Sequence, residues 1–596
     1  MKSLIEQLAR RVKQALADVG VDGDPMVRPV QDEKFGDYQC NAAMSAAKTL
    51  GKKPRDVAAA IVERLDVADM CEAPEIAGPG FINLRLKPKY LARCLAALPA
   101  GHDPRAERLG IEPTPSPQVV VVDLSSPNLA KEMHVGHLRS TVIGDCVARV
   151  LEFQGHTVHR ENHVGDWGTQ FGMLVAHLRS KKPEIVDHPD QLVIQDLESF
   201  YVEAKAHFDA DDDFKRESRE AVVALQQGEP TTRRIWKAFC DESLRHCHAI
   251  YDRLNVRLID RGESSYADLM TEVCRRLEGR LTPDGPVRIS EEALCVFPEG
   301  FKTRDGEALP MIVRKSDGGF NYATSDLATI LDRIEGLHAA RIVYVVGLAQ
   351  KQHFEMLFAS VRMLGWVGED VRLDHLAFGN VLSATGRPFK TREGGTAKLS
   401  GLLDEAVRRA RAVIDTQVGD EGESGPRLSA NEADVVAERV GMAAIKYFDL
   451  SHALQSDYKF DLDTMLSMEG NTAPYMLYAY ARIRSIARKA DVDFARLPAA
   501  DVVLEHPSEI ALARKLVQFA EMLETVGSEL RPNVLTDYLY DLSRTFSRFY
   551  DRKLGVRVID ASPQGVRLSR LRLCDLTART LRLGLHLLGI ETVEQM

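Results

Sequence analysis

The sequence has 596 residues, a formal net charge of −10 and a hydrophobic fraction of 45%. This length allows roughly three or four domains. The composition is that of a soluble globular protein, with no apolar run long enough to span a membrane, and the net charge does not suggest a nucleic-acid partner. The nine cysteines include no C-x-x-C pair, so we interpret them as reduced thiols of a cytoplasmic protein, not as disulfides or a zinc site.

The first 110 residues predict a small domain of alternating helices and strands. The N-terminal segment has apolar residues on one helical face, unlike the continuous apolar core of a signal peptide. A strand-like piece, "GFINLRL", occupies 80–86. The proline-rich stretch "GIEPTPSPQ" at 110–118 is typical of a linker.

A unit of strand, loop, helix and strand follows this linker. The run "VVVVDL" at 119–124 predicts a strand buried on both faces, as in a parallel sheet. Apolar residues at helical spacing predict a helix over 136–153, with Gly155 as its C-cap signal. "HTVHREN" at 156–162 is the next predicted strand. This order is the half-unit of a doubly wound, Rossmann-type α/β sheet that binds nucleotides.

The remaining strands of the sheet come much later in the chain. Strands are predicted at 341–347 and 371–379, with a helix at 350–364 between them. Mixed helix and loop patterns separate the two halves, so we expect a large insertion at about 176–310 to split the sheet. After a stretch of linker composition at 415–434, the pattern is helical almost to the C-terminus.

The stretch "SSPNLAKEMHVGHLRST" at 125–141 carries the clearest chemical signal. It places His134 and His137 where the strand gives way to the helix, and free N–H groups and the helix dipole favour a phosphate there. Both histidines can donate hydrogen bonds to an α-phosphate as charge builds on it. Gly136 would let a flat base lie against the backbone, and Lys131 adds a mobile positive charge.

Taken alone, these features have ordinary alternatives. A single H-x-x-H is more often a pair of surface histidines at a helix start, and the sequence has no P-loop, dinucleotide fingerprint or H-E-x-x-H motif. The segment 544–582 holds ten basic and three acidic residues, a net charge of +7. That charge is compatible with nucleic-acid contact and also with a solvated helix face.

Five sequence blocks in order resemble the arginyl-tRNA synthetases, a family of class I aminoacyl-tRNA synthetases. The stretch at 125–141 is similar to the extended HIGH signature of that family. The further blocks are "ENHVGDWGTQFGML" (161–174), "NYATSDLA" (321–328), "YVVGLAQKQHF" (344–354) and "HLAFGNVL" (375–382). The helical C-terminus, which ends in "LRLGLHLLGIETVEQM", resembles the anticodon-binding domain of the family.

The resemblance implies a Rossmann catalytic core between a small N-terminal α/β (α+β) domain and an all-helical C-terminal domain. We expect the additional tRNA-binding domain at 1–110 and the catalytic core at 117–400, with the insertion inside it. A helical connecting segment with the polar linker follows at 401–455, and the anticodon-binding domain occupies 456–596.

The activity implied by the resemblance joins L-arginine to tRNA in two steps for protein synthesis. ATP and arginine give arginyl-adenylate and pyrophosphate, and the arginyl group then passes to the 2′-hydroxyl of the terminal adenosine of arginine tRNA. Members of the family generally need tRNA before they activate the amino acid. Mg²⁺ would arrive with ATP as substrate, and we expect no protein metal site, no tightly bound cofactor, no membrane partner and a monomer.

The second class I signature, KMSKS, corresponds to the loop "SATGRPFKTREGG" at 383–395, which departs from the pattern. Its usual second lysine is not clearly present, and "PFKTR" offers Lys390, Thr391 and Arg392. In related enzymes the lysine just upstream of the HIGH motif, here Lys131, is thought to compensate. The resemblance assigns catalytic roles to Lys131, His134, His137, Lys390 and Arg392, and ATP binding to His134, Gly136, His137, Val381, Lys390 and Thr391. Without the resemblance, this segment would be a polar surface loop.

A guanidinium substrate requires carboxylates in fork geometry and a flat surface for packing. Tyr322 and Asp326 are four residues apart and can face one pocket. By resemblance, Asp326 pairs with the guanidinium group, Tyr322 packs beside it, and Glu263 is a second acidic contact. The resemblance also assigns Ser126 and Asn128 to the α-amino and carboxylate end, Gln350 to a polar contact and Asp123 to a less defined role. Singly, each residue has an ordinary alternative in the core, on a helix surface or in a loop.

The resemblance places tRNA phosphates against the basic segment 544–582. We assign tRNA contacts to Arg544, Arg548, Arg552 and Arg579. Candidates for stacking on splayed anticodon bases are Tyr478, Tyr480, Tyr538, Phe549 and Tyr550, although core packing is the commoner fate of aromatic residues in helices.

Two other classes of function remain open from sequence. One is a different class I synthetase or a small nucleotidyltransferase with the same H-x-G-H motif. Other synthetases would not need the set of Glu263, Tyr322 and Asp326, and the small transferases lack a long helical C-terminal domain. The other is a non-catalytic paralogue that binds tRNA or acts as a scaffold. That function predicts damage to the ATP site, whereas Lys131, His134 and His137 are all present.

Overall fold

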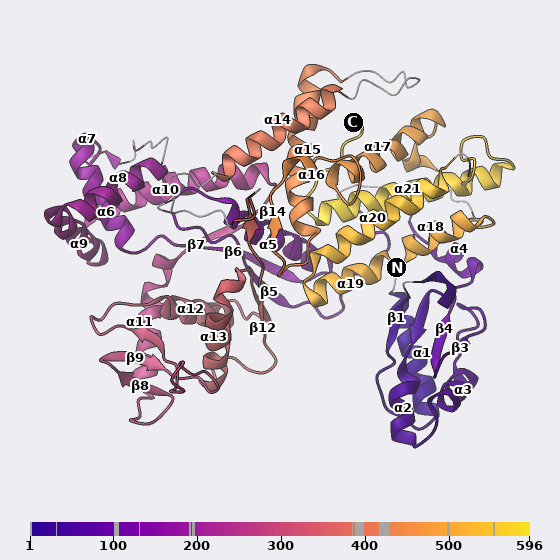
Figure 1. Cartoon of the computed structure of the whole chain (residues 1–596), viewed down its shortest axis with the longest axis horizontal. Coiled ribbons are helices and arrows are strands. Elements are labelled where there is room, and N and C mark those ends of the chain that lie inside the picture. The colour runs from indigo at the N-terminus through magenta and orange to yellow at the C-terminus, as the bar shows by residue number, and fades with distance from the viewer. Residues whose placement is uncertain are drawn as a thin grey trace. The chain divides into compact units, whose positions relative to one another are not determined.

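The fold comes from a computed structural model (Figure 1). It describes residues 3–30, 32–99, 106–129, 131–186, 188–189, 192, 197–383, 385–387, 398–416, 428–497, 501–551, 553 and 555–596. The chain forms two compact units. The first combines residues 1–113 with 467–587 and 591–596, and the second contains 114–466 together with 588–590.

A five-stranded parallel sheet lies at the centre of the second unit. Its strand order is β12-β11-β5-β6-β7. The strands are β5 Val119–Asp123, β6 Thr157–Val164, β7 Ile259–Gly262, β11 Arg341–Tyr344 and β12 Arg372–His375. Val121 faces Ile342 in the pairing of β5 with β11, and the apolar run of β5 is buried because both faces of the sheet are covered.

Helices of the second unit pack on this sheet. α5 (Val135–Phe153) follows β5, and Gly155 after it adopts a φ of +98°, as predicted for a helix end. An apolar core joins the sheet to α11 (Ala267–Glu278), α12 (Tyr322–Leu331) and α13 (Lys351–Met363). The same core includes a three-stranded antiparallel sheet of order β10-β9-β8, built from β8 Val287–Ser290, β9 Ala293–Val296 and β10 Met311–Arg314.

The predicted insertion at 176–310 needs a correction, because β7 lies inside it and is a strand of the parallel sheet. Its sequence, "IDRG", is short, polar and partly exposed at the sheet edge, so it lacks the apolar pattern of a buried strand. The helices between β6 and β7 gather beside one another (Figure 1). They are α6 Thr169–Lys181, α7 Pro183–Val186, α8 Leu197–Ala210, α9 Asp212–Gln226 and α10 Pro230–Arg253.

The remaining elements of the second unit lie between residues 381 and 466, and one of their helices, α15, contacts α5. β13 (Val381–Leu382) pairs in parallel with β14 (Tyr458–Lys459). The helices of this part are α14 Leu399–Thr416, α15 Ala430–Leu450 and α16 Leu462–Met465. The buried Lys446 of α15 donates hydrogen bonds to the carbonyl oxygens of Leu254 at 2.5 Å and Gly589 at 2.8 Å, which fixes the returning segment 588–590.

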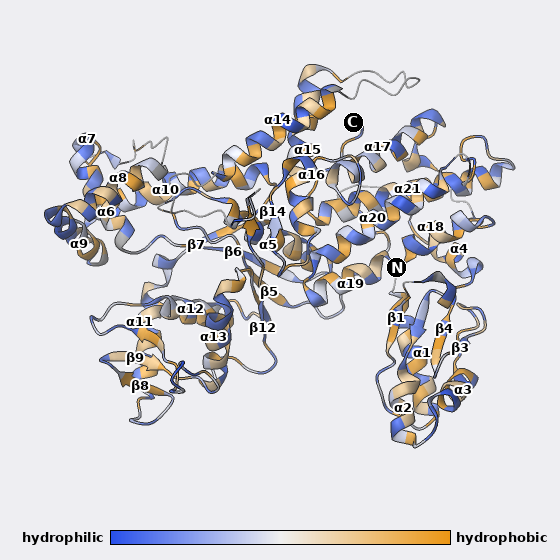
Figure 2. Ribbon diagram, in the orientation of Figure 1, coloured by the Kyte–Doolittle hydropathy of each residue, from blue (hydrophilic) through white to orange (hydrophobic). Residues whose placement is uncertain are grey.

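The first unit contains a four-stranded antiparallel sheet and two sets of helices. Its strand order is β1-β2-β4-β3, from β1 Val27–Pro29, β2 Tyr38–Cys40, β3 Glu75–Ala77 and β4 Phe81–Leu84. The N-terminal helices are α1 Leu4–Asp18, α2 Ala42–Leu50, α3 Pro54–Arg64 and α4 Pro88–Ala96. The C-terminal helices are α17 Ala473–Lys489, α18 Pro507–Val517, α19 Phe519–Glu529, α20 Pro532–Phe549 and α21 Gln564–Leu587. Hydrophobic and hydrophilic residues alternate around helices such as α20 and α21, as expected of amphipathic helices (Figure 2).

Among the described residues, none of the helices has the length and hydropathy needed to cross a membrane.

Candidate active site

The predicted site residues gather at the carboxyl ends of β5 and β11. In the sheet, β6 and β7 lie on one side of β5, and the strands that come later in the sequence, β11 and β12, lie on its other side. The order of strands therefore reverses between β5 and β11, which is where open parallel sheets bind ligands. β5 ends at Asp123, and the loop after it leads to His134, the N-cap residue of α5.

The two histidines of this loop have defined hydrogen-bond roles. The backbone N–H of Gly136 donates to Nδ1 of His134 at 3.0 Å, and the backbone N–H of His134 donates to Nδ1 of His137 at 3.1 Å. A ring nitrogen that accepts a hydrogen bond carries no proton, so the proton of each neutral ring is on Nε2. Each histidine can therefore offer an Nε2–H donor to a phosphate oxygen.

The surroundings keep both rings neutral. Burial lowers the pKa of His137 to about 3, and His134 contributes to this shift. Burial, followed by the charge of Lys131, lowers the pKa of His134. The ring centroids are 3.9 Å apart. A Cβ atom on Gly136 would lie 2.8 Å from the His134 ring, so a larger residue there would force this ring to move.

Asp123 is occupied by neighbouring protein groups. Its Oδ2 accepts from Arg333 at 2.7 Å, and its Oδ1 accepts from the Ser126 hydroxyl at 3.0 Å. Arg333 is fully buried and also donates to Glu161 at 2.8 Å. The geometry therefore favours an indirect role for Asp123, in which it orients Ser126.

Acidic side chains of α12 and of the 3-10 helix Glu263–Tyr266 lie close enough to influence one another. Burial raises the pKa of Glu263 to about 7, with further contributions from the negative charges of Asp166 and Asp326. Burial also raises the pKa of Asp166, although its carboxylate accepts from the Ser264 backbone N–H at 2.8 Å and from the Ser264 hydroxyl at 2.5 Å. A cation placed among these three carboxyl groups would relieve their mutual repulsion.

His353 is a member of this site that sequence reasoning missed. Its Nε2 lies 2.5 Å from Oδ2 of Asp326, and this hydrogen bond raises the pKa of His353. His353 lies in the block "YVVGLAQKQHF", which carried the family resemblance, but a lone histidine on a helix gave no separate signal. Tyr322 opens α12 and is 75% exposed, so it is a surface residue and not part of the core.

Asn128, Gln350 and Lys131 are all exposed. Asn128 forms a parallel bridge with Gly165, and Gln350 ends a short 3-10 helix at the start of α13. Nζ of Lys131 lies 4.9 Å from the centre of the Tyr201 ring, which belongs to α8. This cation–π contact joins the lysine side chain to α8, and the charge of Lys131 also contributes to the lowered pKa of His134.

The second signature lies outside the described residues, because Lys390, Thr391 and Arg392 fall in the segment 388–397. The residues on both sides of that segment are described. Val381 is buried in β13, and Lys398 forms an antiparallel bridge with His134. The backbone N–H of Leu399 also donates to the Met133 carbonyl at 3.0 Å. The described chain therefore resumes at Lys398, next to His134.

The predicted tRNA contacts divide into exposed and buried residues. Arg544 and Arg548 are exposed on α20, and Arg552 lies outside the described residues. The prediction for Arg579 is wrong, because Arg579 is only 4% exposed. Its guanidinium group donates to Glu107 at 2.5 Å and to the Pro99 carbonyl at 2.9 Å. The charge count of 544–582 did not include acidic partners from distant parts of the sequence.

The aromatic candidates divide in the same way. Tyr480, Tyr538 and Phe549 are buried in the helical core. The hydroxyl of Tyr480 donates to Glu594, and that of Tyr538 donates to the Lys515 carbonyl. Tyr478 is exposed and Tyr550 is half-buried. Tyr478 and Tyr550 therefore remain the candidates for base stacking.

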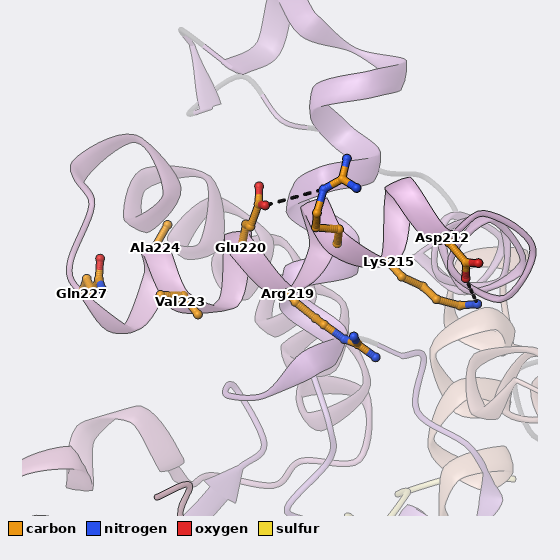
Figure 3. Close-up of a pocket in the computed structure, with 8 residues that line it drawn as sticks. Asp212, Lys215, Arg219, Glu220, Val223, Ala224 and Gln227 are labelled. Atoms are coloured by element: carbon orange, nitrogen blue, oxygen red, sulfur yellow. Dashed lines mark hydrogen bonds and ion pairs between the residues drawn. The ribbon is translucent and has the colours of Figure 1, made fainter. Parts of the chain in front are cut away.

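A surface cavity along α9 is separate from this site (Figure 3). It is lined by Asp212, Lys215, Arg216, Arg219, Glu220, Val223, Ala224 and Gln227. Lys215 pairs with Asp212 at 2.8 Å, and Arg216 lies 3.9 Å from Glu220. The cavity contains none of the predicted site residues, and Lys215 and Arg216 pair with acidic residues of the same helix, so we assign it no catalytic role.

Family models match three consecutive parts of the chain. The model described as "tRNA synthetases class I (R), catalytic domain" matches residues 106–462. The model described as "DALR anticodon binding domain" matches residues 476–596. The model described as "Arginyl tRNA synthetase N terminal domain" matches residues 6–86.

Relatives with curated names and solved structures match the chain over its full length. It is 50% identical over 601 residues to an arginine–tRNA ligase of Nostoc sp. and 49% identical over 604 residues to that of Synechococcus elongatus, with 100% of each chain covered. An arginyl-tRNA synthetase structure from Plasmodium falciparum superposes with a TM-score of 0.85 at 28% identity. The Thermus thermophilus arginyl-tRNA synthetase superposes with a TM-score of 0.80 at 27% identity, and both structural matches cover 100% of each chain.

Proposed function

The chain belongs to the arginyl-tRNA synthetase family, and we infer that it activates L-arginine with ATP and transfers it to arginine tRNA at the site described above. The observation that carries this inference is that the chain combines an acidic cluster at Glu263 and Asp326 with two neutral histidines at the start of α5. The carboxyl groups suit a guanidinium cation, and the histidine Nε2–H groups suit a phosphate.

In the first step, a carboxylate oxygen of arginine attacks the α-phosphorus of ATP. A new P–O bond forms between this oxygen and the α-phosphorus. The bond between the α-phosphorus and the oxygen that bridges to the β-phosphate breaks, and pyrophosphate leaves. The Nε2–H groups of His134 and His137 donate to the α-phosphate oxygens as negative charge grows there. Because both pKa values are lowered, the two rings act as fixed neutral donors and transfer no proton. No general base is needed, because the attacking carboxylate is already ionised at neutral pH.

Positive charge is needed where pyrophosphate departs. We assign this role to Lys131, together with Lys390 and Arg392 of the second signature. The charge of Lys131 contributes to the lowered pKa of His134, which supports a place for this lysine near the phosphates that the histidines would contact. Gly136, Val381 and Thr391 complete the proposed ATP contacts. Mg²⁺ would enter bound to the phosphates of ATP as part of the substrate.

Arginine is held at both ends in this proposal. Glu263 and Asp326 bind the guanidinium group, Tyr322 covers it, and Gln350 adds a polar contact. At the other end, the Ser126 hydroxyl donates its proton to Asp123, so its lone pairs can accept a hydrogen bond from the α-ammonium group. Asn128 lies two residues further along the exposed loop and suits the carboxylate end.

In the second step, the 2′-hydroxyl of the terminal adenosine of tRNA attacks the arginyl carbonyl carbon. An ester bond forms, the bond from that carbon to the phosphate oxygen breaks, and AMP leaves with the hydroxyl proton. We propose that residues 1–110 and the helical domain at 456–596 bind the tRNA, with Arg544, Arg548 and Arg552 on its phosphates. We also propose that the protein works in the cytoplasm as a monomer. All nine cysteines are free thiols, as expected in a reducing compartment.

Aminoacylation with radiolabelled arginine tests this function. The protein should charge arginine tRNA with arginine and with none of the other amino acids. Arginine tRNA with a periodate-oxidised 3′ end should accept nothing, because the attacking hydroxyl is lost. A folded protein that binds tRNA but charges none of it would instead support the non-catalytic paralogue.

A further inference from the structure

The loop after β5 contains two consecutive residues with left-handed backbones. Ser125 has a φ of +69° and Ser126 a φ of +51°. This region is unfavourable for residues with a side chain, so such residues persist where the surrounding structure holds them. The turn lies two residues before Asn128 and sets the direction of the Ser126 hydroxyl. The residues that hold this turn in place therefore affect the part of the site that would bind the α-ammonium and carboxylate groups of arginine.

Asn162, in β6, holds Ser126 directly. It is completely buried, and its Oδ1 accepts from the Ser126 backbone N–H at 2.9 Å. Its Nδ2 donates to Oδ1 of Asp260 at 2.7 Å and to the Tyr251 hydroxyl at 3.3 Å. Because a carboxylate only accepts hydrogen bonds, Asp260 determines that the Asn162 carbonyl, and not its NH₂ group, faces Ser126.

Three side chains hold Ser125 in the same network. The Tyr251 hydroxyl of α10 lies 2.8 Å from the Ser125 hydroxyl, and Thr141 of α5 lies 2.9 Å from it. The Ser125 backbone N–H donates to the Ser140 hydroxyl at 2.8 Å. Tyr251 thus links Asn162 to Ser125, and the left-handed turn is supported from β6, α10 and α5 together.

We propose that Asn162, supported by Tyr251, is a positioning residue that aims the Ser126 hydroxyl at the α-ammonium group of arginine. This inference rests on the proposed function. Asn162 is buried and cannot touch the substrate, so it acts through the backbone of Ser126. Its loss should weaken recognition of the α-ammonium group while the guanidinium pocket of Glu263 and Asp326 is unaffected.

The test compares three ligands on the Asn162→Ala variant in arginine-dependent ATP–pyrophosphate exchange with arginine tRNA present. L-Arginine is the substrate, and agmatine, which lacks the carboxylate, and desamino-arginine, which lacks the α-amino group, are competitive inhibitors. Removal of one buried hydrogen bond should raise the KM for arginine and the Ki for agmatine by about tenfold. The Ki for desamino-arginine and the KM for ATP should stay within about twofold.

Matched variants separate this role from general destabilisation. Asn83→Ala removes another buried asparagine, which accepts from Gln39 at 2.8 Å in the first unit, and it should change none of these constants. Tyr251→Phe removes one oxygen atom and keeps the ring, so it should reproduce the same ligand pattern with about threefold changes even if Asn162→Ala fails to fold.

Equal weakening of all three ligands, or no weakening of any, in both Asn162→Ala and Tyr251→Phe would overturn the positioning role. A wild-type protein without arginine-dependent exchange would instead count against the proposed function itself.

Discussion

Glu263 should make arginine binding depend on pH between 6 and 8. Burial and two neighbouring carboxylates raise its pKa from 4.5 to about 7 in the free protein. A bound guanidinium cation favours the ionised form, so arginine binds best where Glu263 has already lost its proton. About one-tenth of the molecules are ionised at pH 6 and about nine-tenths at pH 8, so the arginine KM should be about tenfold higher at pH 6.

The same shift predicts a stability effect with a definite sign. A carboxyl group whose folded-state pKa is raised holds its proton more tightly when folded, so its contribution to stability falls as pH rises from about 4.5 to about 7. Bound arginine removes this penalty by pairing with the ionised group. Arginine should therefore raise the melting temperature more at pH 8 than at pH 6.

The measurement is the arginine KM in ATP–pyrophosphate exchange at both pH values, with the ATP KM as the internal reference. Glu263→Gln cannot ionise, so its arginine KM should be high at both pH values and lose most of the pH dependence. The matched control is Glu299→Gln, which alters an exposed carboxyl group and should behave like wild type. A wild-type KM that is the same at pH 6 and pH 8, or a Glu263→Gln variant with the full tenfold change, would refute the reasoning.

Three further predictions concern the ATP site, the arginine pocket and the tRNA surface. His134→Ala and His137→Ala should each slow adenylate formation by about 10²- to 10³-fold with tRNA affinity nearly unchanged, and normal pyrophosphate exchange in both variants would remove their role. Asp326→Ala should raise the arginine KM by at least about tenfold while the ATP KM changes little, and equal effects on both constants would contradict the pocket. Arg544→Ala should reduce the salt dependence of tRNA binding by about one unit of slope. Arg579→Ala should leave that slope unchanged and lower the melting temperature, because it removes one side of the buried ion pair between Arg579 and Glu107, at a cost of about 3–5 kcal/mol. A changed slope with an unchanged melting temperature would restore Arg579 to the tRNA surface.

Much of the catalytic fold could be predicted because its strands carry strong local patterns. The valine run of β5, the helical spacing of α5 and the glycine after it are all found as expected. β7 was not predicted, because an edge strand of four residues with a polar, partly exposed sequence has no alternation to detect. Its place depends on pairing with β6, and that information is not local.

The site residues show the same division between local and distant information. His134 and His137 are close in sequence, and their place between a strand and a helix, together with the further family blocks, suggested a phosphate site. His353 and Asp326 lie on different helices and are 27 residues apart in the sequence. The sequence around a single histidine does not show which residue it will contact in the fold. Arg579 was misassigned because its partner, Glu107, lies 472 residues away, and a charge count cannot show which cations are neutralised inside the fold.

Arginine-dependent ATP–pyrophosphate exchange, with and without arginine tRNA, tests the central claim most directly. The account predicts exchange that requires arginine, ATP and arginine tRNA together. Exchange without tRNA would keep the assignment of the active site and remove the dependence of activation on tRNA. No exchange under either condition, in protein shown to be folded and to bind arginine tRNA, would contradict the account and leave a tRNA-binding paralogue without catalysis.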